Sequence, residues 1–225
     1  MLMGFVFSAE ENNLTILSWN IKMLNGPYGW LHNRTERADN IIQSLKSSAG
    51  YDIILFQEAF SGDMRRLMYE GLKTLYPYQI IPDDKTCIGK SNSGLWVISK
   101  SPINILDEIS FSNQKNWDAL SSKGAKLYSV VQDEQKFHII NTHLQADYKT
   151  KYNKIRTQQY TEIYEKLILP NDKSEIPLIL CGDLNISKPG KLKIMLEKLH
   201  LMNGPLFGDL QFSSTGEYQQ LLDYI

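Results

Sequence analysis

The sequence predicts an α/β protein, because short β-rich runs alternate with longer helical segments along its 225 residues. A chain of this length can bury a sizeable core. We find no internal repeat, low-complexity tract or Gly/Ser linker, so we expect one domain over residues 1–225. The alternation of strands and helices, taken alone, also permits a parallel sheet.

The elements follow from apolar periodicity and from turn signals. Asn33 is expected to cap its helix, with Glu36 at the capping-box spacing. The strands on either side of Asp133 and Glu134 are expected to form a hairpin. The last strand reaches the chain end at Ile225, so we expect a domain that is incomplete at its C-terminus. The predicted strands are residues 14–20, 52–58, 94–99, 126–132, 136–142, 177–182 and 221–225, and the predicted helices are residues 33–48, 62–75, 151–169 and 191–199.

Composition narrows the class of protein. The chain is 42% hydrophobic and 22% charged, as in ordinary globular proteins, and its formal net charge of -1 gives no support for polyanion binding through bulk charge. Cys87 and Cys181 form no disulfide framework, and Cys181 lies in an apolar run that predicts a core position. No stretch reaches the roughly 18 apolar residues of a membrane span. Residues 1–9 fit either the remainder of a leader or an edge strand.

Polar residues follow the predicted strands, and strand ends place side chains on a rigid frame at a common edge. A glutamate beside an asparagine oxygen makes a sparse oxygen site, which suits Mg²⁺ because this ion keeps several waters. Taken singly, each residue also fits a bland role, such as a strand end or a solvated loop residue. The polar residues are Asn20, Gln57, Glu58, Asn141, Thr142, His143, Gln145, Asp183, Asn185 and Asp223.

These residue types indicate phosphoryl chemistry. A metal ion can act as a Lewis acid on a phosphoryl oxygen, and a histidine can donate a hydrogen bond to developing negative charge. The pair Asp183 and Asn185 offers a carboxylate to orient a nucleophile and an amide to hold a phosphate oxygen. No serine or cysteine stands in an obvious nucleophile turn, so direct attack by water is favoured.

In series, these segments resemble the endonuclease/exonuclease/phosphatase superfamily, which includes deoxyribonuclease-I-like enzymes and sphingomyelinases. They occur in the family's order along the chain. The resemblance implies a four-layer sandwich of two packed, largely antiparallel β-sheets flanked by helices. The matching segments are Leu17-Ser18-Trp19-Asn20, Ile54-Leu55-Phe56-Gln57-Glu58, Thr142-His143-Leu144, Gly182-Asp183-Leu184-Asn185 and Leu222-Asp223-Tyr224-Ile225.

Within the superfamily, the sequence is more similar to the neutral, magnesium-dependent sphingomyelinases. One of the similar segments resembles a loop in which an aspartate and a lysine five residues later help to set the active conformation. Nucleic-acid-cleaving relatives usually carry other residues in these places. The segments are Gln57-Glu58-Ala59-Phe60, Thr142-His143-Leu144-Gln145-Ala146 and Trp117-Asp118-Ala119-Leu120-Ser121-Ser122-Lys123-Gly124.

The resemblance implies a role for each matching residue. Glu58 and Asn20 would hold Mg²⁺, with Mn²⁺ or Co²⁺ as substitutes. His143 would polarise the phosphoryl group, Asp183 would position the attacking water, and Asn185 would hold a phosphate oxygen. The loop pair would be Asp118 and Lys123, although a lysine before a glycine also fits a solvated turn.

The resemblance also implies a segment that the chain does not contain. Family members continue past the Asp-Tyr strand to a Ser-Asp-His motif, whose histidine is the general base. This chain ends at Ile225, and His32, His138 and His200 do not match that motif. Asp223 matches the aspartate that orients the histidine, which leaves its role here open. We therefore expect either a fragment of a longer protein or a degenerate, weakly active or inactive member.

Three functions follow from these expectations. The leading hypothesis is a phosphodiesterase that acts on sphingomyelin, or a related phospholipid at a membrane surface, and releases ceramide and phosphocholine. The second is a nucleic-acid phosphodiesterase on the same scaffold, which the near-neutral charge disfavours. The third is an inactive fragment or pseudoenzyme that binds metal and phosphate. Secretion is weakly favoured over a cytoplasmic location, and the oligomeric state is left open.

Overall fold

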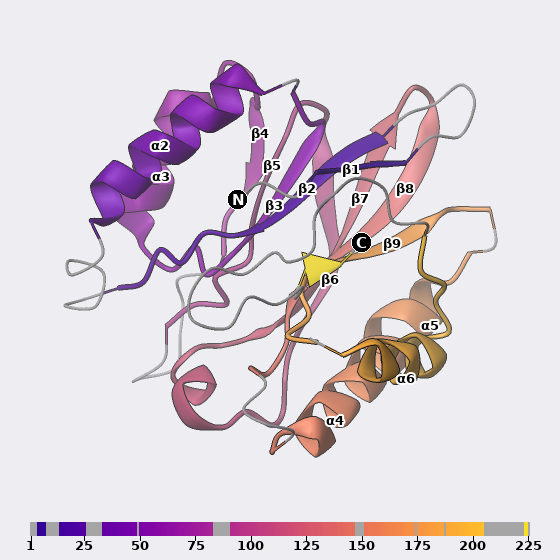
Figure 1. Cartoon of the computed structure of the whole chain (residues 1–225). Coiled ribbons are helices and arrows are strands. Elements are labelled where there is room, and N and C mark those ends of the chain that lie inside the picture. Colours follow the sequence, from indigo (N-terminus) through magenta and orange to yellow (C-terminus); the bar gives the residue numbers. More distant parts are fainter. Residues whose placement is uncertain are drawn as a thin grey trace.

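The structure is a computed structural model in which two five-stranded sheets pack face to face, with helices on their outer faces (Figure 1). This arrangement confirms the predicted α/β sandwich. The structure describes residues 4–7, 14–25, 33–48, 50–82, 91–146, 151–173, 175–186, 188–204 and 223–224, and of residues 4–7, 117 and 223–224 it describes only the backbone. Within this part of the chain, no helix is long and apolar enough to span a bilayer.

The first sheet has the strand order β1-β2-β3-β5-β4, and only β2 and β3 run parallel. Its strands are β1 (Gly4–Phe7), β2 (Leu14–Asn20), β3 (Ile53–Gln57), β4 (Tyr78–Ile80) and β5 (Trp96–Ser99). Helix α2 (Arg34–Ser47) connects the parallel strands, and α3 (Gly62–Leu72) follows β3. Both helices cover the outer face of this sheet (Figure 1).

The second sheet has the order β10-β9-β8-β7-β6, and only β8 and β9 run parallel. Its strands are β6 (Ile103–Ser110), β7 (Gly124–Gln132), β8 (Gln135–His143), β9 (Leu178–Asp183) and β10 (Asp223–Tyr224). A short 3₁₀ helix, η1 (Asn116–Leu120), lies between β6 and β7. The outer face of the second sheet carries α4 (Asn153–Ile163), the π-helical turn η2 (Tyr164–Ile168), α5 (Leu169–Asn171) and α6 (Pro189–Leu199).

Three apolar clusters hold the layers together. One lies between the first sheet and its helices, and its α2 residues follow helical spacing: Ala38, Ile41, Ile42 and Leu45. A second joins the other sheet to α4, η2 and α6. The third lies between the sheets, where the buried side chains include Leu14, Ile53, Leu55, Val97, Tyr128, Ile139 and Cys181. Because the two sheets share this core, their edges are fixed relative to each other.

The two parallel pairs determine which strand ends meet. Asn20 is paired with Gln57 at the ends of β2 and β3, and His143 is paired with Asp183 at the ends of β8 and β9. The carboxyl ends of parallel strands lie at one edge of a sheet, which is where ligand sites form in α/β folds. Contacts of β2 and β3 with β9 bring both edges together.

Several local predictions need correction, although the predicted hairpin is present, with Asp133 and Glu134 at positive φ. The predicted capping box is absent, because Asn33 has a left-handed φ of 45° and its side chain donates to Glu36 instead of accepting from the helix backbone. The second helix ends at Leu72 rather than at residue 75. Of the predicted terminal strand, residues 221–222 and 225 lie outside the described residues.

Candidate active site

The centre of the site is formed by three side chains from both sheets. Asn20 ends β2, Glu58 follows β3, and Asp183 ends β9. The Asn20 amide nitrogen donates to Glu58 Oε1 and to Asp183 Oδ2, both at 2.9 Å. One amide group thus joins two carboxylates, and it links residues that are 163 positions apart in the chain.

The environment of Asp183 disfavours its charged form. Burial raises the pKa of this carboxyl to about 6, and the negative charge of Glu58 acts in the same direction. The hydrogen bond from Asn20 and the charge of Lys123 act against this rise. Two carboxylates this close together repel each other, and added positive charge at this point would stabilise both.

His143 lies beside Asp183, in surroundings that favour the neutral form of its ring. Its Nε2 atom is 3.5 Å from Asp183 Oδ2 and 2.8 Å from the Nζ atom of Lys123. Burial, followed by the charge of Lys123, lowers the pKa of His143 well below its usual value of 6.5. With Nε2 accepting from Lys123, the ring proton belongs on Nδ1, for which the described residues offer no acceptor.

Lys123 and Asp118 form an ion pair of 2.6 Å, and the lysine is buried. The lysine also donates to the Leu144 backbone oxygen at 3.2 Å. The solvated-turn alternative for Lys123 is therefore wrong, because its ammonium group points into the site. The structure brings this loop pair into contact with His143, while its role in setting an active conformation stays a prediction.

Gln145, one of the polar residues that follow the predicted strands, has a positioning role that we did not assign from the sequence. Its amide nitrogen donates to Asp118 Oδ2 at 2.6 Å, and its amide oxygen accepts from the Lys115 backbone nitrogen at 2.8 Å. Arg156 and Gln159 of α4 hold its backbone, at 3.1 and 3.0 Å. Helix α4 therefore positions Asp118 through Gln145. Its sequence signals were its place among the polar residues that follow a predicted strand and its place in a segment used for the family resemblance.

Two residues of the Gly182-Asp183-Leu184-Asn185 segment have a backbone conformation with positive φ. Gly182 has a φ of 140°, and a Cβ atom there would lie 2.0 Å from the Thr142 backbone oxygen. The next strand therefore approaches closely at this point. Asn185 takes a left-handed φ of 51°, its backbone nitrogen donates to Asp183 Oδ1 at 3.1 Å, and its amide donates to Leu144.

A buried amide pair ties the two sheets together beneath the site. The amide nitrogen of Gln57 donates to Asn141 Oδ1 at 2.8 Å, and Asn141 donates back to the Phe56 backbone oxygen at 3.2 Å. Both side chains are fully buried. Their polar character at strand ends suggested a place in the active site. In the structure they instead form hydrogen bonds between the strands that precede Glu58 and carry His143.

These residues line a pocket of about 610 Å³. The lining is mixed, and its apolar members are Leu24, Phe60, Leu120 and Ala146. Its polar members are Lys22, Asn25, Glu58, Ser91, Asp118, Ser121, Lys123, His143, Asp183 and Asn185. The structure therefore brings together every predicted site residue whose side chain it describes, because Asn20 contacts two members of this set.

The remaining histidines and Asp223 lie outside the pocket or have side chains that the structure does not describe. His138 is buried in β8 and His200 stacks on Tyr164, which agrees with their failure to match the motif. His32 lies outside the described residues. For Asp223 only the backbone is described, and it pairs with Asp183 across β9 and β10. Its orienting role stays a prediction.

The donor set fits a sparse cation site in part. The described residues contain no group of three or more His, Cys, Asp or Glu side chains suited to a metal ion. Glu58 offers a carboxylate beside Asp183, and Mg²⁺ is bound in proteins by one or two carboxylates with water completing the shell. Asn20 presents its nitrogen to the carboxylates, and its oxygen accepts from Lys22, so its part as an oxygen ligand stays a prediction.

A four-layer sandwich whose two sheets share one polar edge defines a protein of the deoxyribonuclease-I-like class. Residues 17–225 match the Endonuclease/Exonuclease/phosphatase family, and the chain belongs to that family.

Curated relatives are similar over most of this chain. A protein named sphingomyelinase C from Leptospira interrogans is 28% identical over 228 residues, which cover 91% of this chain and 40% of the relative. A sphingomyelinase C from Bacillus cereus is 27% identical over 196 residues, which cover 80% of this chain and 59% of the relative. The chain therefore spans about half the length of these relatives.

Solved structures share the fold. The crystal structure of SmcL has a TM-score of 0.81 at 23% identity, covering 96% of this chain and 83% of that one. A Staphylococcus aureus beta toxin variant with bound magnesium ions has a TM-score of 0.74 at 23% identity, covering 93% and 81%. A D. rerio TDP2 complexed with a single-stranded DNA product has a TM-score of 0.60 at 18% identity, covering 81% and 64%.

Proposed function

We propose that the protein is a metal-dependent phosphodiesterase that hydrolyses sphingomyelin to ceramide and phosphocholine. The observation that carries this proposal is the mixed lining of the pocket, in which charged and polar groups, among them Lys123 and Asp183, occur together with the apolar side chains of Leu24, Phe60 and Leu120. A phosphodiester that joins a charged head group to a lipid offers both kinds of surface to such a lining. The names of the two relatives support the same substrate class.

The polar side chains supply positioning and charge stabilisation. Lys123 would face the phosphoryl group as a fixed donor, which stabilises the charge that develops as water attacks. For His143 to polarise the same group, its ring proton would have to move from Nδ1 to Nε2, with Nε2 giving up the hydrogen bond from Lys123. Asp183 would accept a hydrogen bond from the attacking water, and Asn185 would hold a phosphate oxygen. The buried Gln145 and the Gln57–Asn141 pair would keep these groups in place without touching the substrate.

Glu58 and Asn20 are the residues that would hold the cation. When bound, a divalent metal supplies Lewis-acid polarisation of a phosphoryl oxygen. Mg²⁺ is the ion we propose, since the two adjacent carboxylates suit it and a structural relative carries bound magnesium ions. Whether Mn²⁺ or Co²⁺ can replace it is a separate prediction, which the same assay tests by exchange of the metal.

The test is release of choline-labelled phosphocholine from sphingomyelin by the whole protein with Mg²⁺. Glu58→Gln keeps the size of the side chain but removes its charge, so we expect a loss of about 100-fold or more. Glu165→Gln, at an exposed position of η2, is the matched control and should keep full activity. Absence of release by the unaltered protein, or full activity of Glu58→Gln, would overturn the proposal.

Two further assays distinguish this function from the other two hypotheses. DNA and RNA offered under the same conditions test a nucleic-acid phosphodiesterase, for which the likeness to TDP2 shows a shared fold alone. Isothermal titration with Mg²⁺ tests the inactive alternative, which requires metal binding that depends on Glu58 without turnover. Release of phosphocholine with no cleavage of nucleic acid is the result that we expect.

A further inference from the structure

The second pair of helices begins at the edge of the sheet that carries the site. Helix α4 follows β8, which ends at His143, and α6 follows β9, which ends at Asp183. Arg156, in the first turns of α4, donates to the backbone oxygen of Gln145, two residues beyond β8. Lys188, the residue before α6, stands three positions after Asn185, which lines the pocket. The starts of both helices therefore lie beside the pocket.

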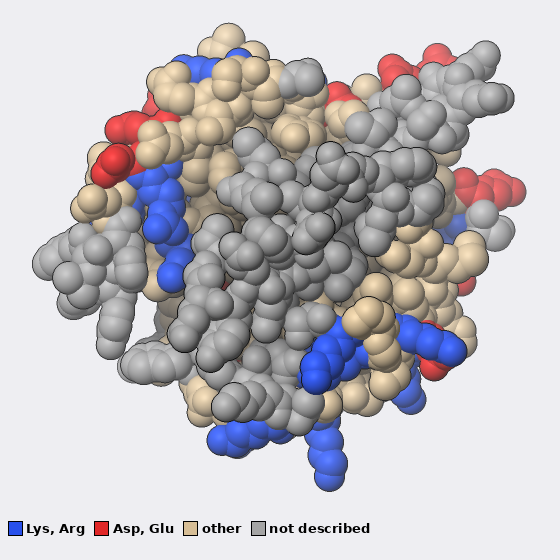
Figure 2. Space-filling model, viewed as in Figure 1, with Lys and Arg blue, Asp and Glu red and all other residues tan. Residues whose placement is uncertain are grey.

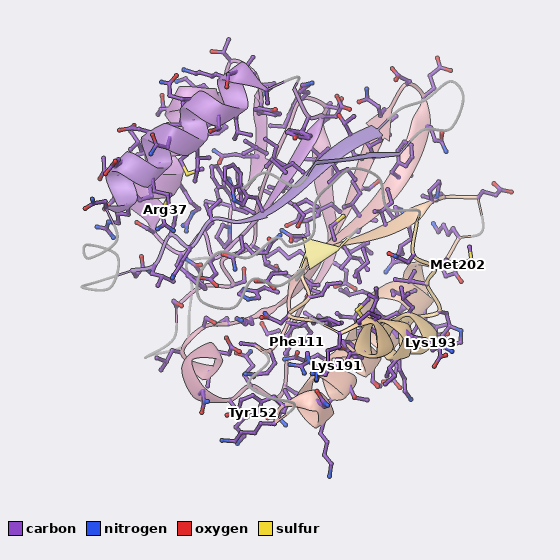
Figure 3. The ribbon with its side chains drawn as sticks, viewed as in Figure 1. Arg37, Phe111, Tyr152, Lys191, Lys193 and Met202 are labelled. Atoms are coloured by element: carbon purple, nitrogen blue, oxygen red, sulfur yellow. The ribbon has the colours of Figure 1, made fainter. Side chains whose placement is uncertain are left out.

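Lysines gather at these two helix starts. In Figure 2, blue side chains lie over α4 and α6 along the lower edge of the view, and Figure 3 labels Lys191 and Lys193 on α6. Neither helix has an acidic residue in its first turn. We use the name α4/α6 lysine surface for the exposed residues Lys151, Lys154, Lys188 and Lys193 together with the half-buried Lys191.

Helix stability does not explain this arrangement. The start of a helix carries partial positive charge, so acidic residues stabilise it and lysines do not. Helices α2 and α3 follow the ordinary pattern, with Glu36 and Asp63 in their first turns. Lys193 pairs with Glu197 at 3.9 Å, so the local excess of positive charge at these helix starts comes from the exposed Lys151, Lys154 and Lys188. An anionic surface that approaches the pocket would offset it.

We propose that the α4/α6 lysine surface binds the anionic head groups of a lipid bilayer and holds the pocket mouth against it. This inference rests on the proposed function, because a lipid substrate is presented by a membrane. Each lysine near an anionic membrane adds to the affinity, and the attraction falls off within a Debye length. At the pocket, Leu120 exposes 52% of its surface, which offers an apolar contact beside the pocket.

The composition of the surface favours lipid over nucleic acid. Surfaces that bind single strands combine basic residues with exposed aromatic rings, and Arg is the usual residue for bidentate phosphate contacts. On the described part of α4 and its start, Arg156, Tyr152 and Tyr160 are all buried. What remains exposed is a group of point charges on flexible stems, which suits a fluid layer of head groups.

The test measures sedimentation with vesicles of phosphatidylcholine alone and of phosphatidylcholine with 30% phosphatidylglycerol. Lys151→Gln, Lys154→Gln and Lys188→Gln are combined in one variant of the whole protein. At about fivefold per lysine, we expect its affinity for the anionic vesicles to fall about 100-fold. The unaltered protein should bind anionic vesicles better than neutral ones, and should lose this preference as the salt concentration increases.

A matched control removes the same charge from the opposite edge of the sheets. Lys46 lies in the last turn of α2, Lys136 is the second residue of β8, and Lys173 precedes β9, and all three are exposed. Their combined Lys→Gln variant should bind anionic vesicles like the unaltered protein. Equal losses in both triple variants would show that only net charge matters and would overturn the proposal.

A soluble substrate separates this inference from the proposed function. Neither triple variant alters a residue that lines the pocket, so both should hydrolyse monomeric short-chain sphingomyelin at the normal rate. Vesicle binding that depends on the α4/α6 lysine surface, without hydrolysis of any sphingomyelin, would support membrane binding by this surface and overturn the proposed function. If the first triple variant keeps its vesicle affinity but loses affinity for duplex DNA, the surface serves nucleic acid and the inference fails.

Discussion

The buried ion pair between Asp118 and Lys123 allows a quantitative prediction. Its atoms are 2.6 Å apart, and the two side chains are 12% and 4% exposed. Lys123→Met would leave the Asp118 carboxylate without its cation, and breaking a buried pair in this way costs about 3–5 kcal/mol. Asp118 keeps hydrogen bonds from Gln145 and Ala146, so we expect the lower end, about 3 kcal/mol.

The double variant isolates the interaction. Asp118→Asn alone leaves the Lys123 ammonium group buried with two neutral partners, His143 and the Leu144 backbone. Combining it with Lys123→Met removes both charges, so the double variant should be more stable than the sum of the single losses predicts. We expect a coupling energy of about 1–3 kcal/mol, the range for residues in direct contact.

Urea unfolding at pH 7, followed by circular dichroism, measures all four proteins. A loss of about 3 kcal/mol corresponds to a decrease in Tm of roughly 6–12 °C for a chain of this size. Lys73→Met is the matched control, because Lys73 pairs with Glu70 at the same 2.6 Å but both side chains are more than half exposed. Its midpoint should not change. Equal losses for the two lysines, or a coupling energy near zero, would refute the reasoning.

Three further predictions concern the strands under the site. Gly182→Ala puts a Cβ atom 2.0 Å from the backbone oxygen of β8, so we expect a loss of more than about 4 kcal/mol, seen as a lower Tm, whereas Gly190→Ala meets nothing within 4 Å and should be tolerated. Gln57→Leu leaves the buried Asn141 oxygen without its donor and should cost about 1–3 kcal/mol in urea unfolding; an unchanged midpoint would contradict this. Burial lowers the pKa of His138 below 6.5, so its contribution is complete above pH 6.5 and is lost as the pH falls; His138→Gln should flatten this loss in melts from pH 8 to pH 5.

The strands that were predicted from sequence are those with continuous buried runs. Ile53 to Phe56 is one example, because all four side chains are buried and the apolar run is unbroken. Strand β6 was missed because it is an edge strand with mostly exposed side chains, and β4 because it has only three residues. The capping box failed at Asn33, where a left-handed backbone conformation was not visible in the spacing of residues.

The site residues that were predictable from the sequence are those that lie at the ends of strands. Glu58, His143 and Asp183 converge because parallel strands end at one edge, and the order of motifs identified them. Gln145 and Arg156 could not be assigned in this way, since their partners lie in a loop and a helix whose packing depends on the whole fold. Their roles depend on buried hydrogen bonds that only the folded arrangement brings about.

The Asn20 amide that joins Glu58 to Asp183 has a consequence for how the chain could be divided. Of the strands that the structure describes, those before β6 form the first sheet, and those from β6 onward form the second. A cut between Ser99 and Ile103 would leave one fragment with Asn20 and Glu58 and the other with the histidine and Asp183. Neither fragment contains a site, so any activity recovered on mixing would report directly that the two sheets had reassociated.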